Sequence, residues 1–282
     1  MYYQIERFDG YYRIGSAENV FSYLIPGTER AMLIDTGYGL GNLKEAVEEL
    51  TRLPLFIVNT HGHCDHVGGN AQFDCPCFLH PADWGMAKEH CSPEMRHMNA
   101  ERLAHSLNYE TGEEFSALPE DFNMEKFTAL GAGKLVEANE GMIFDLGGIT
   151  LELVETPGHT AGGISVLWRE KGLLFVGDAA NFFVWLFCAE STGKQSYLDM
   201  LDKIDALPVT GYIGGHNPIV MTHENIARFR RAAIEADYSK GFPFQALFGR
   251  DRNARVCPLN GMTMEDLFKP DFAAVVIAPD WQ

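Results

Sequence analysis

Three histidines and an aspartate lie within six positions, in the run Asn59-Thr-His-Gly-His-Cys-Asp-His66. The run directly follows the apolar segment 55–58, which is typical of a short strand. Neutral imidazole and carboxylate groups are ligands that zinc, and also non-haem iron or manganese, prefers in proteins. Glycines at 62, 68 and 69 permit the tight backbone that lets such side chains converge. The pattern predicts a metal site whose ligands include His61, His63, Asp65 and His66.

Three further residues of ligand type follow short apolar segments: His159 in Thr-Pro-Gly-His, Asp178 in Val-Gly-Asp and His216 in Gly-Gly-His. Taken singly, a histidine after glycine is more often a turn residue and an aspartate more often a cap. Taken together, four loops that follow strands carry metal-type ligands, and a rigid sheet presents a site at one edge in this way. We therefore expect all seven side chains to meet.

The pattern of apolar residues indicates two αβ halves. Alternating or continuous apolar segments predict strands, and apolar residues at helical spacing predict helices. The predicted strands are 5–8, 11–14, 20–25, 31–34, 55–58, 149–153, 164–168 and 173–176, and the predicted helices are 43–50, 197–204 and 226–234.

Between the halves, residues 84–135 are polar and favour helix, so they resemble an insertion near the active-site cleft rather than a third core. Four methionines in it suit an adaptable apolar pocket, although ordinary helix packing explains them equally well. We expect a domain over residues 1–240 and a C-terminal tail over 241–282 that packs in cis or on a second subunit. A homo-oligomer through the insertion or the tail stays open.

Charge and composition exclude several classes of partner. The chain has 39 acidic and 22 basic side chains, a net charge of −17, which opposes binding to the phosphates of nucleic acid. No apolar run approaches the roughly 20 residues that cross a bilayer, and the first residues lack the features of a secretory signal. A cytoplasmic location and a small-molecule substrate are therefore expected, and the six cysteines are expected to be reduced thiols.

The ordered motifs, from Asp35 through the histidine run to His159, Asp178 and His216, resemble those of the metallo-β-lactamase superfamily over residues 15–235. The resemblance implies an α/β fold of the four-layer αβ/βα sandwich type. It also implies two divalent metal ions, most often zinc, with iron or manganese as alternatives. In that scheme the first ion is held by His61, His63 and His159, the second by Asp65, His66 and His216, and Asp178 bridges both.

The chemistry implied by the resemblance is hydrolysis by a metal-bridging hydroxide, with Asp65 and Asp178 as catalytic carboxylates. Asp35 is expected to orient a ligand histidine, although a simple cap at the end of a strand is an alternative interpretation. Asn181, three residues after Asp178, is a candidate for a hydrogen bond to substrate or an ordinary loop residue.

Within the superfamily, Asp178 disfavours the β-lactamases proper, which carry cysteine or no side-chain ligand there. His63 disfavours the flavodiiron oxygen reductases, and the net charge disfavours the nucleases. The remaining interpretation is a glyoxalase II-like or lactonase-like enzyme that cleaves an ester, thioester, lactone or related small-molecule bond. An iron oxidoreductase of the same fold, similar to a persulfide dioxygenase, is the alternative, and a non-catalytic metal-binding protein is a third.

Several other side chains are assigned to packing. The aromatic run Phe182 to Phe187 is expected in a core rather than along a substrate wall. Cys64 occupies the variable position of the histidine run and is not expected to be a ligand. The remaining histidines lack the spacing of metal ligands, and we expect them in packing or surface positions: His80, His90, His97, His105 and His223.

Overall fold

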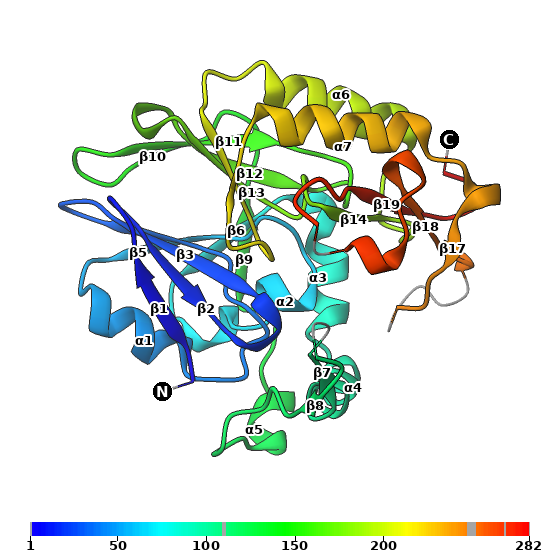
Figure 1. Ribbon diagram of the computed structural model, residues 1–282. Helices are drawn as coiled ribbons and strands as arrows, with labels where there is room; N and C mark the ends of the chain where they lie inside the picture. The colour runs from blue at the N-terminus through cyan, green and yellow to red at the C-terminus, as the bar shows by residue number, and fades with distance from the viewer. Residues whose placement is uncertain (1, 109–110, 247–251, 268, 282) are drawn as a thin grey trace. The chain divides into compact units, whose positions relative to one another are not determined.

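The computed structural model describes residues 2–108, 111–246, 252–267 and 269–281 (Figure 1). The chain forms two compact units, Met1–Glu152 and Leu153–Gln282. Each unit contains both strands and helices, as the apolar pattern predicts.

The first unit is built on a seven-stranded sheet of order β1-β2-β3-β4-β5-β6-β9. Pairing is antiparallel from β1 to β4 and parallel from β4 through β5 and β6 to β9. Parallel strands carry their carboxyl ends to one edge, so the loop after β5 leaves the sheet beside the loop after β4. The strands are β1 (Gln4–Arg7), β2 (Tyr12–Gly15), β3 (Phe21–Pro26), β4 (Ala31–Ile34), β5 (Leu55–Val58), β6 (Pro76–Leu79) and β9 (Lys134–Glu137).

Helix α1 (Leu43–Leu50) crosses from β4 to β5 and has the predicted bounds. The Asn42 side chain caps it by accepting the Glu45 N–H. Its apolar face packs against sheet residues that include Leu33 and Ile57. Because that face is fixed against the sheet, the start of β5 and the loop that follows it are fixed as well.

The segment 84–135 contains the helices that its composition predicts, together with a short hairpin. Arg96 of α4 is buried, and its guanidinium donates to the Gly68 carbonyl at 2.7 Å and lies 5.0 Å from the Phe127 ring centroid. The insertion thus packs directly on the loop that carries the histidine run. Its elements are α3 (Trp84–His90), α4 (Pro93–Leu103), β7 (Ser106–Leu107), β8 (Glu114–Phe115) and α5 (Met124–Thr128), and α2 (Cys64–Val67) precedes it.

A second sheet has six strands in the order β10-β11-β12-β13-β15-β16. The chain passes from the first unit into the second within β11. β12 and β13 are antiparallel, whereas β13 and β15 are parallel. The strands are β10 (Ile143–Asp145), β11 (Thr150–Glu155), β12 (Ile164–Trp168), β13 (Leu173–Gly177), β15 (Gly211–Gly214) and β16 (Val220–Met221).

Helices α6 (Lys194–Asp205) and α7 (His223–Glu235) lie side by side in the second unit (Figure 1). Their apolar faces share one core with residues of β13 and β15, including Leu174 and Tyr212. Both helices extend a turn beyond the predicted segments 197–204 and 226–234, because their first turns are polar and carry no apolar periodicity.

Part of the C-terminal segment packs in cis, in a four-stranded sheet of order β14-β19-β18-β17. β14 (Phe183–Leu186) pairs in parallel with β19 (Ala274–Ile277), which pairs with β18 (Arg255–Pro258), and β17 (Phe242–Pro243) forms the edge. The aromatic side chains of β14 pack against Phe244 and this core, so the prediction of a packing role is confirmed.

Short 3-10 turns complete the described chain: η1 (Ala17–Asn19), η2 (Asn70–Gln72), η3 (Pro81–Asp83), η4 (Arg169–Lys171), η5 (Tyr238–Lys240), η7 (Leu259–Gly261) and η8 (Met264–Asp266). All six cysteines are free thiols, as predicted. Among the described residues, no helix combines the length and apolar character needed to cross a membrane.

Candidate metal centre

In the first unit, the histidine run forms the loop after β5 and the short helix α2, with His63 at the helix N-terminus. Close packing requires the two glycines that follow the run, Gly68 and Gly69. A Cβ at Gly68 would lie 2.3 Å from the Tyr38 carbonyl oxygen, and one at Gly69 would lie 2.4 Å from that of Thr36. The absence of side chains here lets the loop after β4 rest on the ligand run, as expected for these glycines.

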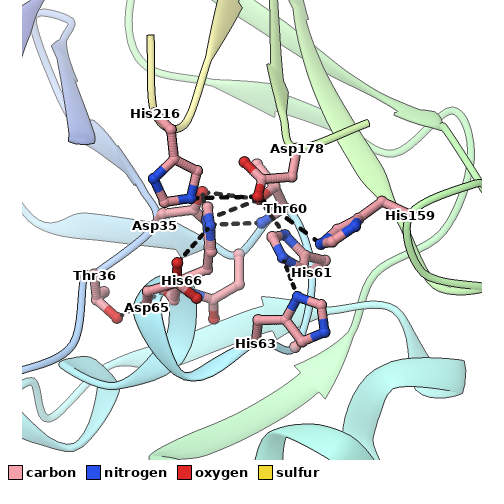
Figure 2. Close-up of polar contacts among 12 residues, drawn as sticks. Asp35, Thr36, Thr60, His61, His63, Asp65, His66, His159, Asp178 and His216 are labelled. Carbon is pink, nitrogen blue, oxygen red and sulfur yellow. Dashed lines mark hydrogen bonds and ion pairs between the residues drawn. The ribbon is translucent and has the colours of Figure 1, made fainter. Parts of the chain in front are cut away.

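His66 is oriented by Asp35, which directly follows β4. The His66 Nδ1–H donates to Asp35 Oδ2 at 2.8 Å (Figure 2). With the proton fixed on Nδ1, Nε2 is the nitrogen that can coordinate a metal. Asp35 also accepts the Thr60 backbone N–H on Oδ1 at 2.7 Å, and its φ of 59° is unusual for a residue other than glycine.

His61 is oriented by the same carboxylate through Thr60. The Thr60 hydroxyl donates its single proton to Asp35 Oδ2 at 2.8 Å and lies 3.1 Å from His61 Nδ1. Since the proton of the hydroxyl is committed to Asp35, its oxygen accepts from the His61 Nδ1–H. The Nε2 of His61 therefore also carries the lone pair, and Asp35 sets the tautomer of two histidines.

The remaining ligand candidates of this unit lie beside these two. His63 Nδ1 is 3.0 Å from His61 Nε2, and Asp65 Oδ2 is 3.7 Å from His66 Nε2. Two imidazole nitrogens at 3.0 Å share either one proton or one cation. The first unit therefore brings His61 close to His63 and Asp65 close to His66, at nitrogen and oxygen atoms of the type that hold metals.

A buried polar network fixes the backbone under these side chains. The His66 carbonyl accepts from the Thr36 N–H at 2.8 Å and from the Asn59 side-chain amide at 2.9 Å. Asn70 exchanges hydrogen bonds with Asn59, and its amide oxygen accepts from the Thr36 hydroxyl at 2.8 Å. A fully bonded network of this kind restricts the loop to one conformation.

In the second unit, His159 follows β11 in a turn that lies against α6. A Cβ at Gly158 would come within 2.6 Å of the Tyr197 ring. The His159 Nδ1–H donates to the Trp185 carbonyl of β14 at 2.7 Å, and the Ser191 hydroxyl donates to the His159 carbonyl at 2.8 Å. As for His66, the Nδ1 bond leaves Nε2 as the atom that can bind a metal.

Asp178 and His216 follow the neighbouring parallel strands β13 and β15. Gly177 has a φ of 51°, in the left-handed region that favours glycine, and its carbonyl accepts the Gly215 N–H at 2.9 Å. Asp178 Oδ2 lies 3.3 Å from His216 Nε2 and 3.8 Å from His159 Nε2 (Figure 2). In the second unit, the two candidate histidines thus lie near one carboxylate oxygen of the third candidate, Asp178.

Other residues singled out by the sequence have less specific places. Asn181 lies half-buried between β13 and β14, and its role in substrate binding stays a prediction. Burial raises the pKa of the Cys64 thiol, so this group is neutral at physiological pH.

Sequence reasoning missed residues that contact the candidate ligands or the turn between them, chiefly Thr60, Asp83 and His90. His90 was expected in a packing or surface position; it is buried, and the ring on which it stacks is that of His63. For Thr60 the signal is its position next to His61. For Asp83 and His90 no pattern in the chain connects them to the run.

The donor set fits a metal centre. Within each unit, imidazole nitrogens and carboxylate oxygens of the candidate residues lie close to one another, and these are atoms that metal ions prefer. In His61, His66 and His159, the Nδ1 atom is hydrogen-bonded to an oxygen atom. Histidines that bind a metal through Nε2 usually make such a bond at Nδ1.

The family model of the metallo-beta-lactamase superfamily matches residues 15–216. The chain belongs to this superfamily. The match includes all seven predicted ligands and Asp35, so the resemblance seen in the sequence is confirmed at the level of the family.

Curated relatives include human Acyl-coenzyme A thioesterase MBLAC2, which is 28% identical over 186 residues, 60% of each chain. Hydroxyacylglutathione hydrolase GloC of Haemophilus influenzae is 29% identical over 153 residues, 53% of this chain and 61% of that protein. The matches thus span about 60% of the length of these relatives.

Among solved structures, the metallo-beta-lactamase family protein TTHA1429 of Thermus thermophilus superposes with a TM-score of 0.57 at 23% identity, and 79% of each chain is covered. At this identity the likeness concerns the fold alone. Together with the family match it confirms the predicted fold class, the α/β sandwich of the metallo-β-lactamase type.

Proposed function

We propose that this protein is a metal-dependent hydrolase that cleaves a thioester bond in a small molecule. In the proposed centre, one divalent ion would be held by His61, His63 and His159 and a second by Asp65, His66 and His216. Asp178 would supply a carboxylate to both. The observation that carries the proposal is that the superfamily match includes both groups of ligands in one ordered set, residues 15–216.

The tautomers of the histidines support this assignment. The His66 Nδ1–H donates to Asp35, the His61 Nδ1–H donates to the Thr60 hydroxyl, which itself donates to Asp35, and the His159 Nδ1–H donates to the Trp185 carbonyl. Each of these three rings is therefore a neutral imidazole with its lone pair on Nε2, which is the form of histidine that binds metal.

When bound, divalent ions in such a centre lower the pKa of water and polarise the carbonyl group of a substrate. The chain supplies two carboxylates to the centre, Asp65 and Asp178, against the four positive charges of two divalent ions. The excess of positive charge favours binding of an oxyanion and stabilises the negative charge that develops when a carbonyl is attacked. Zinc is the proposed metal because imidazole and carboxylate ligands suit it, and iron or manganese would be held by the same atoms.

A thioester is proposed because one relative is named an acyl-coenzyme A thioesterase and another a hydroxyacylglutathione hydrolase. The wider class predicted from the sequence, which includes esters and lactones, provides the comparison substrates. A thiolate is a better leaving group than an alkoxide, so strong protonation of the leaving atom is not required.

The test begins with elemental analysis of protein purified without a metal-binding tag. It continues with rates of hydrolysis for short and long acyl-coenzyme A esters, lactoylglutathione, an oxygen ester and a lactone. Two zinc ions per chain and preferred thioester cleavage are expected. Asp178→Asn is the inactive control for the hydrolysis assays. It keeps the size of the side chain and removes its charge, so it should lose metal and activity.

Protein that binds no metal, or that hydrolyses none of these substrates when metal-loaded, would overturn the proposal. One iron per chain with uptake of oxygen would replace it with the persulfide dioxygenase-like alternative.

A further inference from the structure

The segment Pro81–His90, formed by η3 and α3, packs against the turn that separates His61 from His63. The Asp83 carboxylate accepts the Gly62 backbone N–H at 3.0 Å. Asp83 is only 1% exposed, so this charge-assisted bond is shielded from water. The bond fixes the backbone of the turn at the residue between the two histidines.

An aspartate immediately before a helix usually caps that helix, but Asp83 makes no capping bond to α3 with its side chain. Its Oδ2 atom is directed to Gly62 instead. The Asp83 carboxylate thus bonds to a loop about 20 residues earlier in the chain and not to the helix that it precedes. This indicates that its role lies outside α3.

Gly62 fits this close approach. A Cβ there would lie 2.8 Å from the Asp83 carbonyl oxygen and 2.9 Å from the Met86 methyl group. The η3–α3 segment is itself anchored to the sheet, because the Trp84 indole N–H donates to the Leu79 carbonyl of β6 at 2.9 Å. The support under the turn is therefore connected to a rigid element.

His90, in the last turn of α3, stacks on the face of His63. The ring centroids are 5.2 Å apart and the rings are inclined by 14°. Both side chains are buried, with exposed fractions of 7% and 4%. Stacking on the face restricts rotation of the His63 ring without occupying Nδ1, the atom that lies 3.0 Å from His61 Nε2.

We propose that Asp83 and His90 are positioning residues for the ligand pair His61 and His63. Asp83 sets the backbone of the turn and His90 sets the plane of the His63 ring, so the insertion builds part of the metal centre. This inference rests on the proposed function in one respect, that His61 and His63 bind a metal ion.

The experiment compares four substitutions: Asp83→Ala, Asp83→Asn, His90→Ala and His90→Phe. The measurements are affinity for Zn²⁺ by competition with a chelator and the absorption spectrum of the Co²⁺-loaded protein, which reports ligand geometry. Thermal stability of the metal-free protein is followed in parallel. Lys88→Ala, on the exposed side of the same helix, is the control and should match the wild type.

We expect each alanine variant to lose about 10- to 100-fold in metal affinity and to show a changed Co²⁺ spectrum. Asp83→Asn retains an oxygen that accepts the Gly62 N–H, and His90→Phe retains a flat ring. Both should therefore restore most of the affinity and the spectrum of the wild type. Rescue by these two variants would identify the hydrogen bond and the stack as the causes.

The inference is overturned if the alanine variants lower only thermal stability and leave affinity and spectrum unchanged. It is also overturned if His90→Phe loses as much as His90→Ala and Asp83→Asn as much as Asp83→Ala. Wild-type protein that binds neither Zn²⁺ nor Co²⁺ would instead defeat the proposed function, so the two failures are distinguishable.

Discussion

The two groups of candidate ligands are held in different ways. In the first unit, four candidate ligands lie on one continuous segment, the loop after β5 and helix α2, and buried side chains, above all the Asp35 carboxylate, orient them. In the second, three candidate ligands on separate loops follow strands of one sheet; the Trp185 carbonyl orients the His159 ring, and the Gly177 carbonyl fixes the backbone just before His216. A loop needs a polar network to fix its side chains, whereas the edge of a sheet is already fixed by strand pairing.

The contrast predicts different sensitivities to substitution. In the first group, side chains such as that of Asp35 orient the candidate ligands, and a single mutation can remove such a side chain. Around the second, the orienting atoms belong to the main chain, so that mutations of neighbouring side chains should matter less and the ligands themselves should dominate.

The largest effect is expected for Asp178→Asn. Its carboxylate oxygen lies within 3.8 Å of both His159 Nε2 and His216 Nε2, so loss of its charge should lower the affinity of the protein for both proposed ions. We expect a loss of more than about 100-fold in metal affinity, beyond the range typical of residues that only support ligands. Metal content after dialysis against a chelator is the measurement, with His216→Ala as the comparison. Retention of both ions by Asp178→Asn would exclude a bridging role.

The next effect distinguishes the two groups directly. Asp35→Asn removes the carboxylate that orients His66 and, through Thr60, His61, and we expect a loss of about 10- to 100-fold in metal affinity. Ser191→Ala removes one neutral hydrogen bond to the His159 carbonyl, and we expect a loss of less than about tenfold. Equal losses in chelator competition would contradict the difference between the groups.

The sequence predicted the local elements well because their signal is local. Ala31–Ile34, Leu43–Leu50 and Ile164–Trp168 have the predicted bounds, since each is an apolar pattern complete within a few residues. The parallel pairing of β14 with β19 could not be predicted in this way, because partners so distant in the chain leave no periodic trace.

The candidate ligands were found for a related reason. The histidine run is dense and contiguous, so it is unusual in any sequence, whereas Asp83 and His90 are single polar residues in an insertion. Their contacts with Gly62 and His63 depend on how α3 packs on the ligand loop. Tertiary packing of this kind has no counterpart in composition or spacing.

A third prediction concerns the stability of the first group's loop. Gly68→Ala would place a Cβ 2.3 Å from the Tyr38 carbonyl oxygen, and the resulting overpacking should lower the free energy of unfolding by about 1 to 3 kcal/mol. Gly85→Ala is the matched control, because no atom lies within 4 Å of a Cβ there and alanine favours the α3 helix. Urea denaturation of the two variants provides the comparison. Similar stabilities would show that the loops after β4 and β5 can separate at little cost.

The smallest effect is expected at His223, which shows what a histidine without a ligand role looks like. Its Nδ1 lies 2.7 Å from Asp205 Oδ1 and 3.1 Å from the Tyr212 hydroxyl, and its Nε2 lies 2.8 Å from the Val209 carbonyl. Because oxygen atoms lie beside both nitrogens, the protonated ring can donate a hydrogen bond from each of them. The ligand candidates His66 and His159 also have an oxygen partner on Nδ1, but their Nε2 atoms lie 3.7 and 3.8 Å from the carboxylates of other candidate ligands, which is longer than a hydrogen bond.

The hydrogen bond to Asp205, followed by that to the Val209 carbonyl, raises the pKa of His223. A raised pKa in the folded state means that protonation stabilises the fold. The stabilisation is complete below the unfolded-state pKa of about 6.5 and is lost as pH rises through the folded-state value. Because the side chain is 46% exposed, solvent screening limits the effect to about 0.5 to 1 kcal/mol. His223→Gln should therefore be less stable than the wild type at pH 5.5 and nearly equal to it at pH 9. A difference in urea midpoints that is independent of pH would contradict a charged His223.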